Sequence, residues 1–129
     1  MATIKRQVVL DRHADEVWNE LSDFSAAGRL FAGVLTGCET RDDLRVVTFA
    51  NGRKVTEKLV TLDRSERRLA YTVLDGSFTH HMASMQILPE GAGSVFVWIS
   101  DFLPDAAAPG IVPLVEAGCQ AFRLAIGRV

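Results

Sequence analysis

The sequence predicts an α+β domain in which a curved, seven-stranded antiparallel sheet wraps around a long C-terminal helix. Three observations support this fold class. Residues 4–10 alternate as a strand, residues 34–103 contain six strand-like segments joined by short turns, and residues 113–129 have helical periodicity. A sheet of seven strands must twist and curl, so the last helix is expected to fill its concave face. The 129 residues are expected to form one domain, 1–129.

Two short helices are expected between the first strand and the second. Val17 and Leu21 lie four residues apart and give the first helix an apolar face, while acidic residues fill its first turn. His13 occupies the N-cap position, where it is a weaker cap than Ser or Asp. A second short helix is expected over residues 25–31 and ends at Gly33.

Turn signals divide the central region into six strands. Asn51-Gly52 and Asp75-Gly76 are strong hairpin signals, and Pro104 ends the sheet. Because short turns join consecutive strands, these strands should form an antiparallel meander that the N-terminal strand extends. The expected strands are residues 34–40, 44–50, 53–63, 67–74, 77–88 and 94–103.

The last helix is expected to span residues 113–129, because Pro113 suits a first turn and argues against a regular helix that begins much earlier. Its polar residues form one narrow stripe and the rest is apolar, so the helix should be enclosed. Gly118 costs ~1 kcal/mol relative to Ala in mid-helix. It either allows a close approach of backbone or ligand, or is a tolerated defect. The polar stripe consists of Glu116, Gln120 and Arg123.

Composition argues against several classes of function. The net charge is −2, so no basic excess indicates a nucleic-acid partner. No apolar run reaches the ~18 residues of a membrane span, so no stable membrane insertion is expected. The N-terminus lacks the pattern of a secretory leader, and a cytoplasmic location is expected. Cys38 and Cys119 are expected to be small core residues, and no metal or other cofactor is predicted.

The order of elements and several local motifs resemble the START-like, or helix-grip, superfamily (SRPBCC, Bet v 1-like). More closely, the chain resembles the polyketide cyclase/dehydrase and lipid-transport family, which includes the plant abscisic acid receptors. The matching pieces are ADEVWNELSDF, GRLFAGV, VTEKLVTLDRSERRLAYTV and VFVWISDFLPD. The chain departs from the usual pattern at His13-Ala14, where members have a Ser-like cap, and at Leu30-Phe31, where members carry a Trp. The resemblance implies the fold and a cavity, whereas functions within the family differ.

Glu57 is the sharpest candidate for function. Strand alternation places it on the same face as Val55 and Leu59, which should point toward the helix. A carboxylate there costs several kcal/mol unless it is paired, hydrated or neutral. The resemblance implies a cavity-facing Glu, because abscisic acid receptors have one in the matching motif. Glu57 is then a polar anchor or a general acid/base; alternatively, it is a structural residue bridged by water or by a basic residue on a neighbouring strand.

His81 is expected to face the cavity, because alternation directs its neighbour His80 outward. It titrates near neutrality and could share a proton with a ligand, or it is a rim histidine without a chemical role. Tyr71 lies on the strand between Glu57 and His81 and could complete a polar line across the cavity floor. No third ligand at a recognisable spacing suggests a metal site.

The last strand directs its aromatic side chains inward. Trp98 is then either a core residue or a platform for a ligand. The opposite face, with Val97 and Ile99, is expected to be exposed and apolar, which suggests a homodimer contact.

The sequence therefore predicts a protein that binds a small hydrophobic or aromatic molecule, as a carrier or sensor, between the sheet and the C-terminal helix. The alternative is a polyketide cyclase/dehydratase-type enzyme in which Glu57, His81 and Tyr71 move protons. A third reading is a filled cavity and a role for the sheet surface in a dimer. The residues expected to line the cavity are Val55, Glu57, Leu59, Tyr71, His81, Ala83, Met85, Trp98, Phe102, Val115, Gly118 and Phe122.

Overall fold

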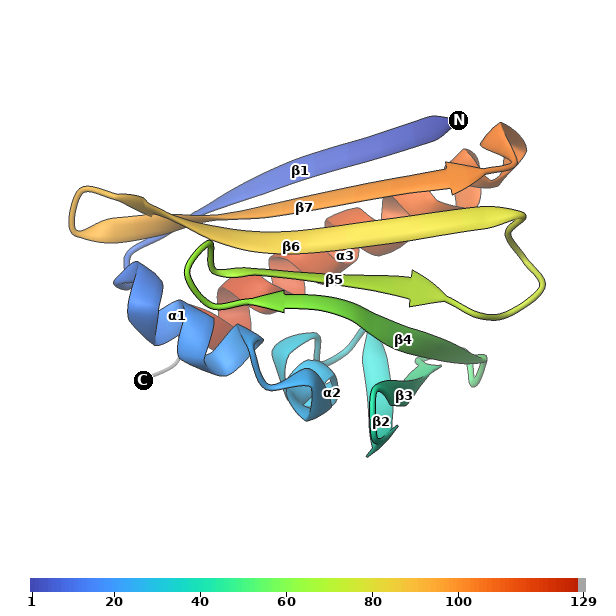
Figure 1. The fold of residues 1–129 in the computed structure, drawn as a ribbon, viewed down its shortest axis with the longest axis horizontal. Coiled ribbons are helices and arrows are strands. Elements are labelled where there is room, and N and C mark those ends of the chain that lie inside the picture. Colours follow the sequence, from blue (N-terminus) through green and yellow to red (C-terminus); the bar gives the residue numbers. More distant parts are fainter. Residues whose placement is uncertain (128–129) are drawn as a thin grey trace.

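The computed structural model describes residues 1–127 and confirms the predicted fold class. Its seven strands form one antiparallel sheet in the order β1-β7-β6-β5-β4-β3-β2, and α3 crosses behind the sheet (Figure 1). The strands are β1 (Ala2–Leu10), β2 (Leu35–Arg41), β3 (Leu44–Phe49), β4 (Lys54–Asp63), β5 (Arg68–Val73), β6 (His80–Glu90) and β7 (Gly93–Leu103). The helices are α1 (Ala14–Leu21), α2 (Ala27–Leu30) and α3 (Ala108–Gly127), with 3₁₀ turns at Phe24–Ala26 and Asp105–Ala107.

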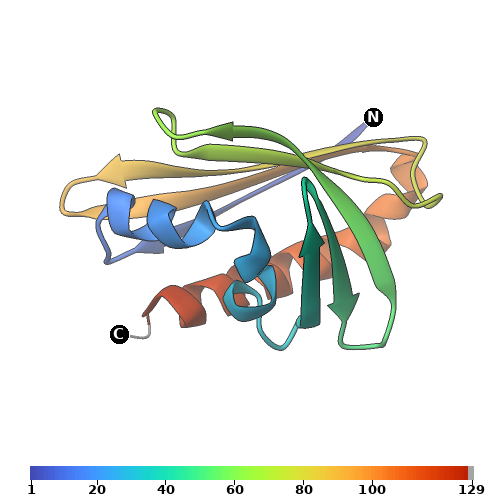
Figure 2. The same cartoon turned by 60° about the horizontal axis from the view of Figure 1, so that its bottom comes forward.

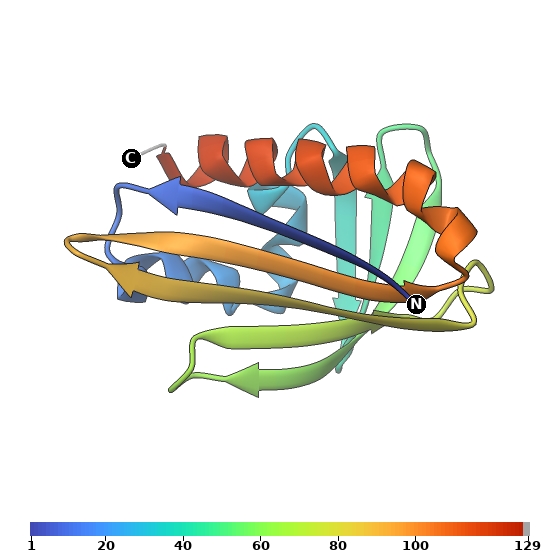
Figure 3. The same ribbon diagram turned by 90° about the horizontal axis from the view of Figure 1, so that it is seen from above.

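The sheet is strongly curved and does not close. Its pairing shifts register between Leu35 and Gly37 in β2 and between Leu59 and Thr61 in β4. Such irregularities bend a strand and increase its twist. As a result, β2 and β3 run steeply across the direction of α3, whereas β1, β6 and β7 run along it (Figures 2 and 3). The concave face that forms between these two parts of the sheet is the one that α3 covers.

The start of α3 differs from the sequence prediction. The helix begins at Ala108, directly after a 3₁₀ turn, so Pro113 lies inside it. The alanines at positions 106–108 favour a helix, and Pro109 suits its first turn. Ile111 packs partly against the core. These contributions outweigh the backbone hydrogen bond that Pro113 cannot make. Residues 128 and 129, which were assigned to the same helix, lie outside the described residues.

The prediction that α3 is enclosed was also wrong. One face is buried, but Leu124 on the opposite face is 55% exposed, and even Leu114, which borders the cavity side, is 39% exposed. The sheet curves around only one side of the helix, so the apolar residues on the outer side face solvent (Figure 3). The buried face consists of Val115, Gly118, Cys119, Phe122 and Ile126.

The C-terminal half of α3 packs into a filled aromatic core. Phe122 is fully buried and stacks on Phe96, with ring centroids 4.2 Å apart, and on Phe31 at 5.7 Å. Arg12, in the loop after β1, donates to Glu20 on α1 at 2.6 Å and to the Ile126 carbonyl at 3.1 Å. These hydrogen bonds tie α1 to the C-terminal end of α3, so this end of the molecule is closed.

The outer face of β7 is less exposed than predicted. Val97 is only 6% exposed, and its cross-strand partners Gln7 and Gln86 carry longer side chains that flank it. Ile99 is partly buried. The apolar surface on which the homodimer prediction rested is therefore small, and dimerisation stays a prediction.

The remaining sequence expectations concern metals, cysteines and membranes. Within residues 1–127, no group of His, Cys, Asp or Glu side chains is arranged to hold a metal ion. Cys38 and Cys119 are free thiols, the second of them buried. None of the described helices has the length and apolar character needed to cross a membrane.

Candidate ligand-binding site

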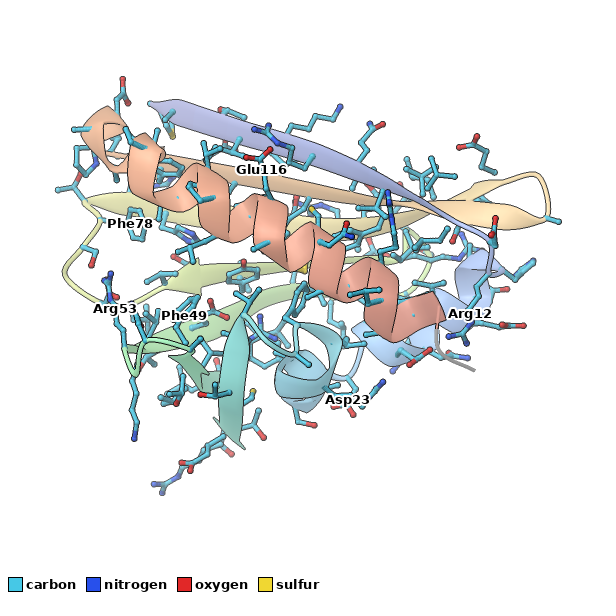
Figure 4. The ribbon with its side chains drawn as sticks, turned by 180° about the vertical axis from the view of Figure 1, so that it is seen from behind. Arg12, Asp23, Phe49, Arg53, Phe78 and Glu116 are labelled. Carbon is cyan, nitrogen blue, oxygen red and sulfur yellow. The ribbon has the colours of Figure 1, made fainter. Side chains whose placement is uncertain are left out.

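A cavity of about 600 Å³ lies under the N-terminal half of α3, between that helix, α2 and the strands β2 to β7. Phe49 and Phe78 lie at this end of the molecule, opposite the end that Arg12 closes (Figure 4). Most of the wall is apolar, so the site suits a hydrophobic molecule. The apolar lining comprises Phe31, Val34, Leu35, Val47, Phe49, Val55, Val73, Phe78, Met85, Ile111, Leu114 and Val115.

Gly118 brings α3 close to the sheet at one wall of the cavity. A Cβ atom at this position would lie 2.7 Å from Cζ3 of Trp98, closer than real Cβ contacts, and 3.1 Å from Cη2, which is tighter than most of them. Of the two interpretations of this mid-helix glycine, the structure shows the close approach. The absence of a side chain at Gly118 therefore allows the Trp98 indole to lie directly against α3.

A buried ion pair forms part of the wall. Arg45 and Glu57 are opposite each other in the pairing of β3 with β4, and Arg45 Nε donates to Glu57 Oε1 at 2.8 Å. Their side chains are only 7% and 10% exposed. Arg45 Nη1 also donates to the Phe24 carbonyl at 3.1 Å, and the guanidinium lies 4.0 Å from the centroid of the Phe24 ring. These contacts supply the short ion pair and the additional hydrogen bond that offset the cost of removing two charges from water.

Glu57 combines the two roles that the sequence left open. It is held by a basic residue on a neighbouring strand, and it also lines the cavity. Burial raises the pKa of Glu57, and the Arg45 charge offsets part of that increase. The carboxylate is therefore a hydrogen-bond acceptor already engaged by Arg45, rather than an isolated base.

Arg45 was missed in the sequence, because β3 was interpreted as a β-branched and apolar strand. The sequence feature that could have identified it is strand alternation. Arg45 alternates with Val47 and Phe49, so it lies on the face that points to the core. A charged residue at such a position needs a partner. Glu57, across the hairpin, is that partner.

Tyr71 lies at the centre of the polar wall. It is 5% exposed, with Arg45 5.2 Å from its ring centroid and the His81 ring 5.9 Å away. Burial strongly raises the pKa of Tyr71, and the nearby Glu57 raises it further. The hydroxyl therefore stays protonated at neutral pH, where it can donate or accept a hydrogen bond.

His81 faces the cavity as predicted, but its protonation differs from the expectation. Its Nδ1 accepts a hydrogen bond from the Val73 backbone N–H at 3.1 Å, beyond the point where β5–β6 pairing ends. Burial, assisted by His80, lowers the pKa of His81 from 6.5 to about 4. At neutral pH the ring is neutral, its lone pair on Nδ1 is occupied and its proton is on Nε2. His81 is therefore neutral at the cavity wall, and its Nδ1 is not free to act as a base.

The rim of the cavity carries a polar bridge between two loops. Arg53, after the β3–β4 turn, lies 3.3 Å from Asp75 Oδ2 and also donates to the Ser77 hydroxyl. Both partners belong to the β5–β6 loop, and all three residues line the cavity. The bridge thus joins the two loops that border the apolar interior.

Some of the predicted lining residues do not border the cavity. Phe122 is fully buried in the aromatic core, Phe102 is fully buried beside Phe78 at the other end of the molecule, and Ala83 is 1% exposed. Leu59 lies just before the register shift that bends β4 away. The predicted residues that do line the cavity are Val55, Glu57, Tyr71, His81, Met85, Trp98, Val115 and Gly118.

Comparisons with known proteins agree with this architecture. Residues 1–126 match the model of a family described as polyketide cyclase / dehydrase and lipid transport. No curated protein sequence matches the chain. A solved structure from Thermobifida fusca is similar at 29% identity and a TM-score of 0.79, over 98% of this chain and 91% of that one.

Two further solved structures are similar in fold alone, because their identity is low. An uncharacterised protein from Bacillus thuringiensis has 18% identity and a TM-score of 0.85, over 97% of this chain and 98% of that one. Norcoclaurine synthase from Thalictrum flavum has 18% identity and a TM-score of 0.77, over 99% and 94%. With its family match across nearly the whole sequence and a Bet v 1-like fold, the chain belongs to the polyketide cyclase/dehydrase and lipid-transport family.

Proposed function

We propose that this protein binds a small hydrophobic or aromatic molecule in the cavity under α3, as a carrier or sensor in the cytoplasm. The observation that carries the proposal is the cavity itself. Its volume of about 600 Å³ and largely apolar wall suit a molecule of a few fused rings or a short lipid. The few buried polar groups in the wall would orient such a molecule.

An aromatic ligand is also supported by one of the structural neighbours. Norcoclaurine synthase from Thalictrum flavum has been solved in complex with dopamine and hydroxybenzaldehyde, which are both aromatic molecules. The likeness covers 92% of this chain at 17% identity. We carry over only the class of ligand, because the identity is too low to transfer an activity.

A cyclase/dehydratase-type enzyme is the second candidate. The observation that favours it is Glu57, a carboxyl group in the cavity wall whose pKa is raised by burial. Such a group could exchange a proton with a bound polyketide. The occupied Nδ1 of His81 and the pairing of Glu57 with Arg45 favour binding over proton transfer.

Titration with the neutral fluorescent dye Nile red tests the binding proposal. We expect saturable binding of one dye per chain. Ile111→Trp, which adds volume at the cavity wall, should weaken binding at least tenfold. Leu124→Trp is the matched control on the exposed side of the same helix and should leave binding unchanged. Absence of saturable binding, or equal binding by the two variants, would contradict a ligand cavity.

A further inference from the structure

The side of α3 that faces away from the sheet carries an uncharged apolar stripe. Its four residues follow one another at spacings of three, four and three: Leu114, Ala117, Ala121 and Leu124. This spacing keeps the side chains on one side of a helix and is typical of the seam between two paired helices. The stripe runs from Leu114, at the border of the cavity, to Leu124, opposite the core. We call these four residues the outer stripe.

The outer stripe belongs to a helix that is apolar over most of its circumference. Between Ala108 and Gly127, α3 has only two charged residues, Glu116 and Arg123. Single exposed leucines are common on protein surfaces, but a helix of this composition is normally enclosed. In one chain the sheet covers only one side of α3, and the other side stays open (Figures 3 and 4). A partner on the open side would complete the enclosure.

The outer stripe is self-complementary. Its order, Leu-Ala-Ala-Leu, reads the same in both directions and is symmetric about position 119. If two α3 helices pack antiparallel, Leu114 of each copy therefore meets Leu124 of the other, and Ala117 meets Ala121. A two-fold interface needs such reciprocal contacts. The alanines at the centre allow the helix axes to approach to about 8 Å, and the leucines fill the space at both ends.

The two charged residues of α3 follow the same symmetry. Glu116 and Arg123 lie on the flank toward β1, where both border a shallow groove beside Arg6. They are seven residues apart and centred close to position 119. An antiparallel pair therefore brings Glu116 of each copy to Arg123 of the other, whereas a parallel pair would bring like charges together. Glu116 is available for this contact, because its side chain is 58% exposed and its ion pair with Arg6 is 3.7 Å long.

We infer that the protein forms a two-fold homodimer in which the α3 helices of two copies pack antiparallel through the outer stripe. This surface differs from the β7 face that the sequence suggested, and the inference does not depend on the proposed ligand. A membrane surface fits less well, because helices that lie on membranes have a polar face rich in Lys and Arg, whereas the flank of α3 has one acid and one base. A single pair of helices makes a small interface, so the dimer should be weak and reversible.

Sedimentation equilibrium of the full chain over a concentration series tests the inference. We expect a reversible monomer–dimer equilibrium with a Kd of about 1–100 µM. Leu124→Lys should weaken association at least about tenfold, because it places an unpaired cation against Leu114 of the other copy at both ends of the interface. Leu88→Lys is the matched control. It adds the same charge at an exposed leucine of β6 and should leave association unchanged.

A charge exchange tests the antiparallel arrangement. Glu116→Arg and Arg123→Glu should each weaken association about fivefold, because each places like charges at both inter-helix contacts. The double variant Glu116→Arg/Arg123→Glu restores opposite charges and should associate to within about twofold of the unmodified protein. A parallel pair predicts no such recovery, because like charges would already meet in the unmodified protein.

Several results would overturn the inference. A chain that stays monomeric over the whole series does not form this dimer. A dimer that persists in Leu124→Lys, or that Leu88→Lys dissociates equally, uses another surface. If Leu124→Lys dissociates the dimer but the double variant associates no better than the single charge variants, the antiparallel arrangement is wrong. None of these results depends on Nile red binding, so the cavity proposal is tested separately.

Discussion

Arg45 and Glu57 form an ion pair of 2.8 Å across two neighbouring strands, with both side chains almost completely buried in the cavity wall. The pair keeps two charges in an otherwise apolar wall without leaving either of them unpartnered. Removing one partner of a buried pair lowers the free energy of unfolding more than removing one partner of a surface pair. The reason is that each buried charge depends on the other charge in place of water.

We therefore predict that removing one partner is costly and removing both is not. Arg45→Met should lower the free energy of unfolding by about 3–5 kcal/mol, because Glu57 is left buried and unpaired. The double variant Arg45→Met/Glu57→Leu should recover most of this loss. Chemical unfolding with urea measures both. Lys58→Met, in an exposed pair with Asp43, is the control and should change stability by less than about 1 kcal/mol.

If the single variant is as stable as the unmodified protein, or if the double variant is as unstable as the single one, the pair does not act as a unit.

A second prediction concerns the contact between Gly118 and Trp98. A Cβ at Gly118 would lie 2.7 Å from the indole, so Gly118→Ala should force the ring to move at a cost of about 1–3 kcal/mol. The gain in helix propensity offsets about 1 kcal/mol, so the net loss of stability is about 0–2 kcal/mol. Gly110→Ala, in the same helix with no atom within 4 Å of the added Cβ, should instead stabilise by about 0.5–1 kcal/mol.

Thermal unfolding of the two glycine variants gives a direct comparison. The ordering is the decisive result: a Gly118 variant at least as stable as the Gly110 variant would show that the indole can move freely. Gly118→Ala should also weaken Nile red binding, because the displaced ring would occupy part of the cavity.

The fold was predictable from the sequence because it depends on local patterns. Alternation in the strands and the turn at Asn51-Gly52 specify a meander, and the apolar last segment specifies a covering helix. The start of that helix was not predictable from Pro113 alone, because tertiary packing at Ile111 compensates for the missing backbone hydrogen bond. Local propensity sets the elements, whereas packing sets their ends.

The candidate site was only partly predictable. Alternation correctly directed Glu57 and His81 inward, but it cannot show which part of the concave face is filled. Phe122 fills it at one end, whereas the small residue Gly118 leaves Trp98 at the cavity wall. Which end stays open depends on how α3 crosses the sheet, and this geometry has no signature in the sequence.

A third prediction follows from the state of His81. Its pKa is lowered from 6.5 to about 4, so the unfolded chain binds more protons than the folded protein between these values. The contribution of His81 to stability is complete above pH 6.5 and is lost as the pH falls toward 4. Without solvent screening, a shift of this size would correspond to about 3 kcal/mol, at about 1.4 kcal/mol per pKa unit. Because the ring is partly open to solvent, we expect about 1–2 kcal/mol.

Urea unfolding of the unmodified protein and of His81→Asn between pH 4 and pH 7 measures the contribution of His81 to the free energy of unfolding. The asparagine Oδ1 lies at the same distance along the side chain as His81 Nδ1 and can accept the hydrogen bond from Val73 N–H, but the side chain does not titrate. The variant should therefore lose about 1–2 kcal/mol less stability than the unmodified protein over this range. Identical pH profiles for the two proteins would show that His81 is protonated as easily in the folded state as in the unfolded chain.

The last prediction separates a binding protein from an enzyme. An aryl 1,5-diketone that can close a ring by an intramolecular aldol reaction serves as the probe. We expect the protein to bind it and to release it unchanged, because Glu57 is paired with Arg45, His81 Nδ1 is occupied and Tyr71 is protonated. Mass spectrometry of the recovered probe, against a sample without protein, measures turnover.

Glu57→Gln is the variant that decides between the two functions. In a carrier or sensor it should change probe affinity by less than about fivefold and leave the recovered probe as before, because one neutral acceptor replaces a paired one. In an enzyme that uses this carboxyl group, cyclised product should form with the unmodified protein and fall about 10²–10⁴-fold in the variant. Formation of product by the unmodified protein, with that dependence on Glu57 in a variant that remains folded, would overturn the binding role, because a carrier or sensor releases its ligand unchanged.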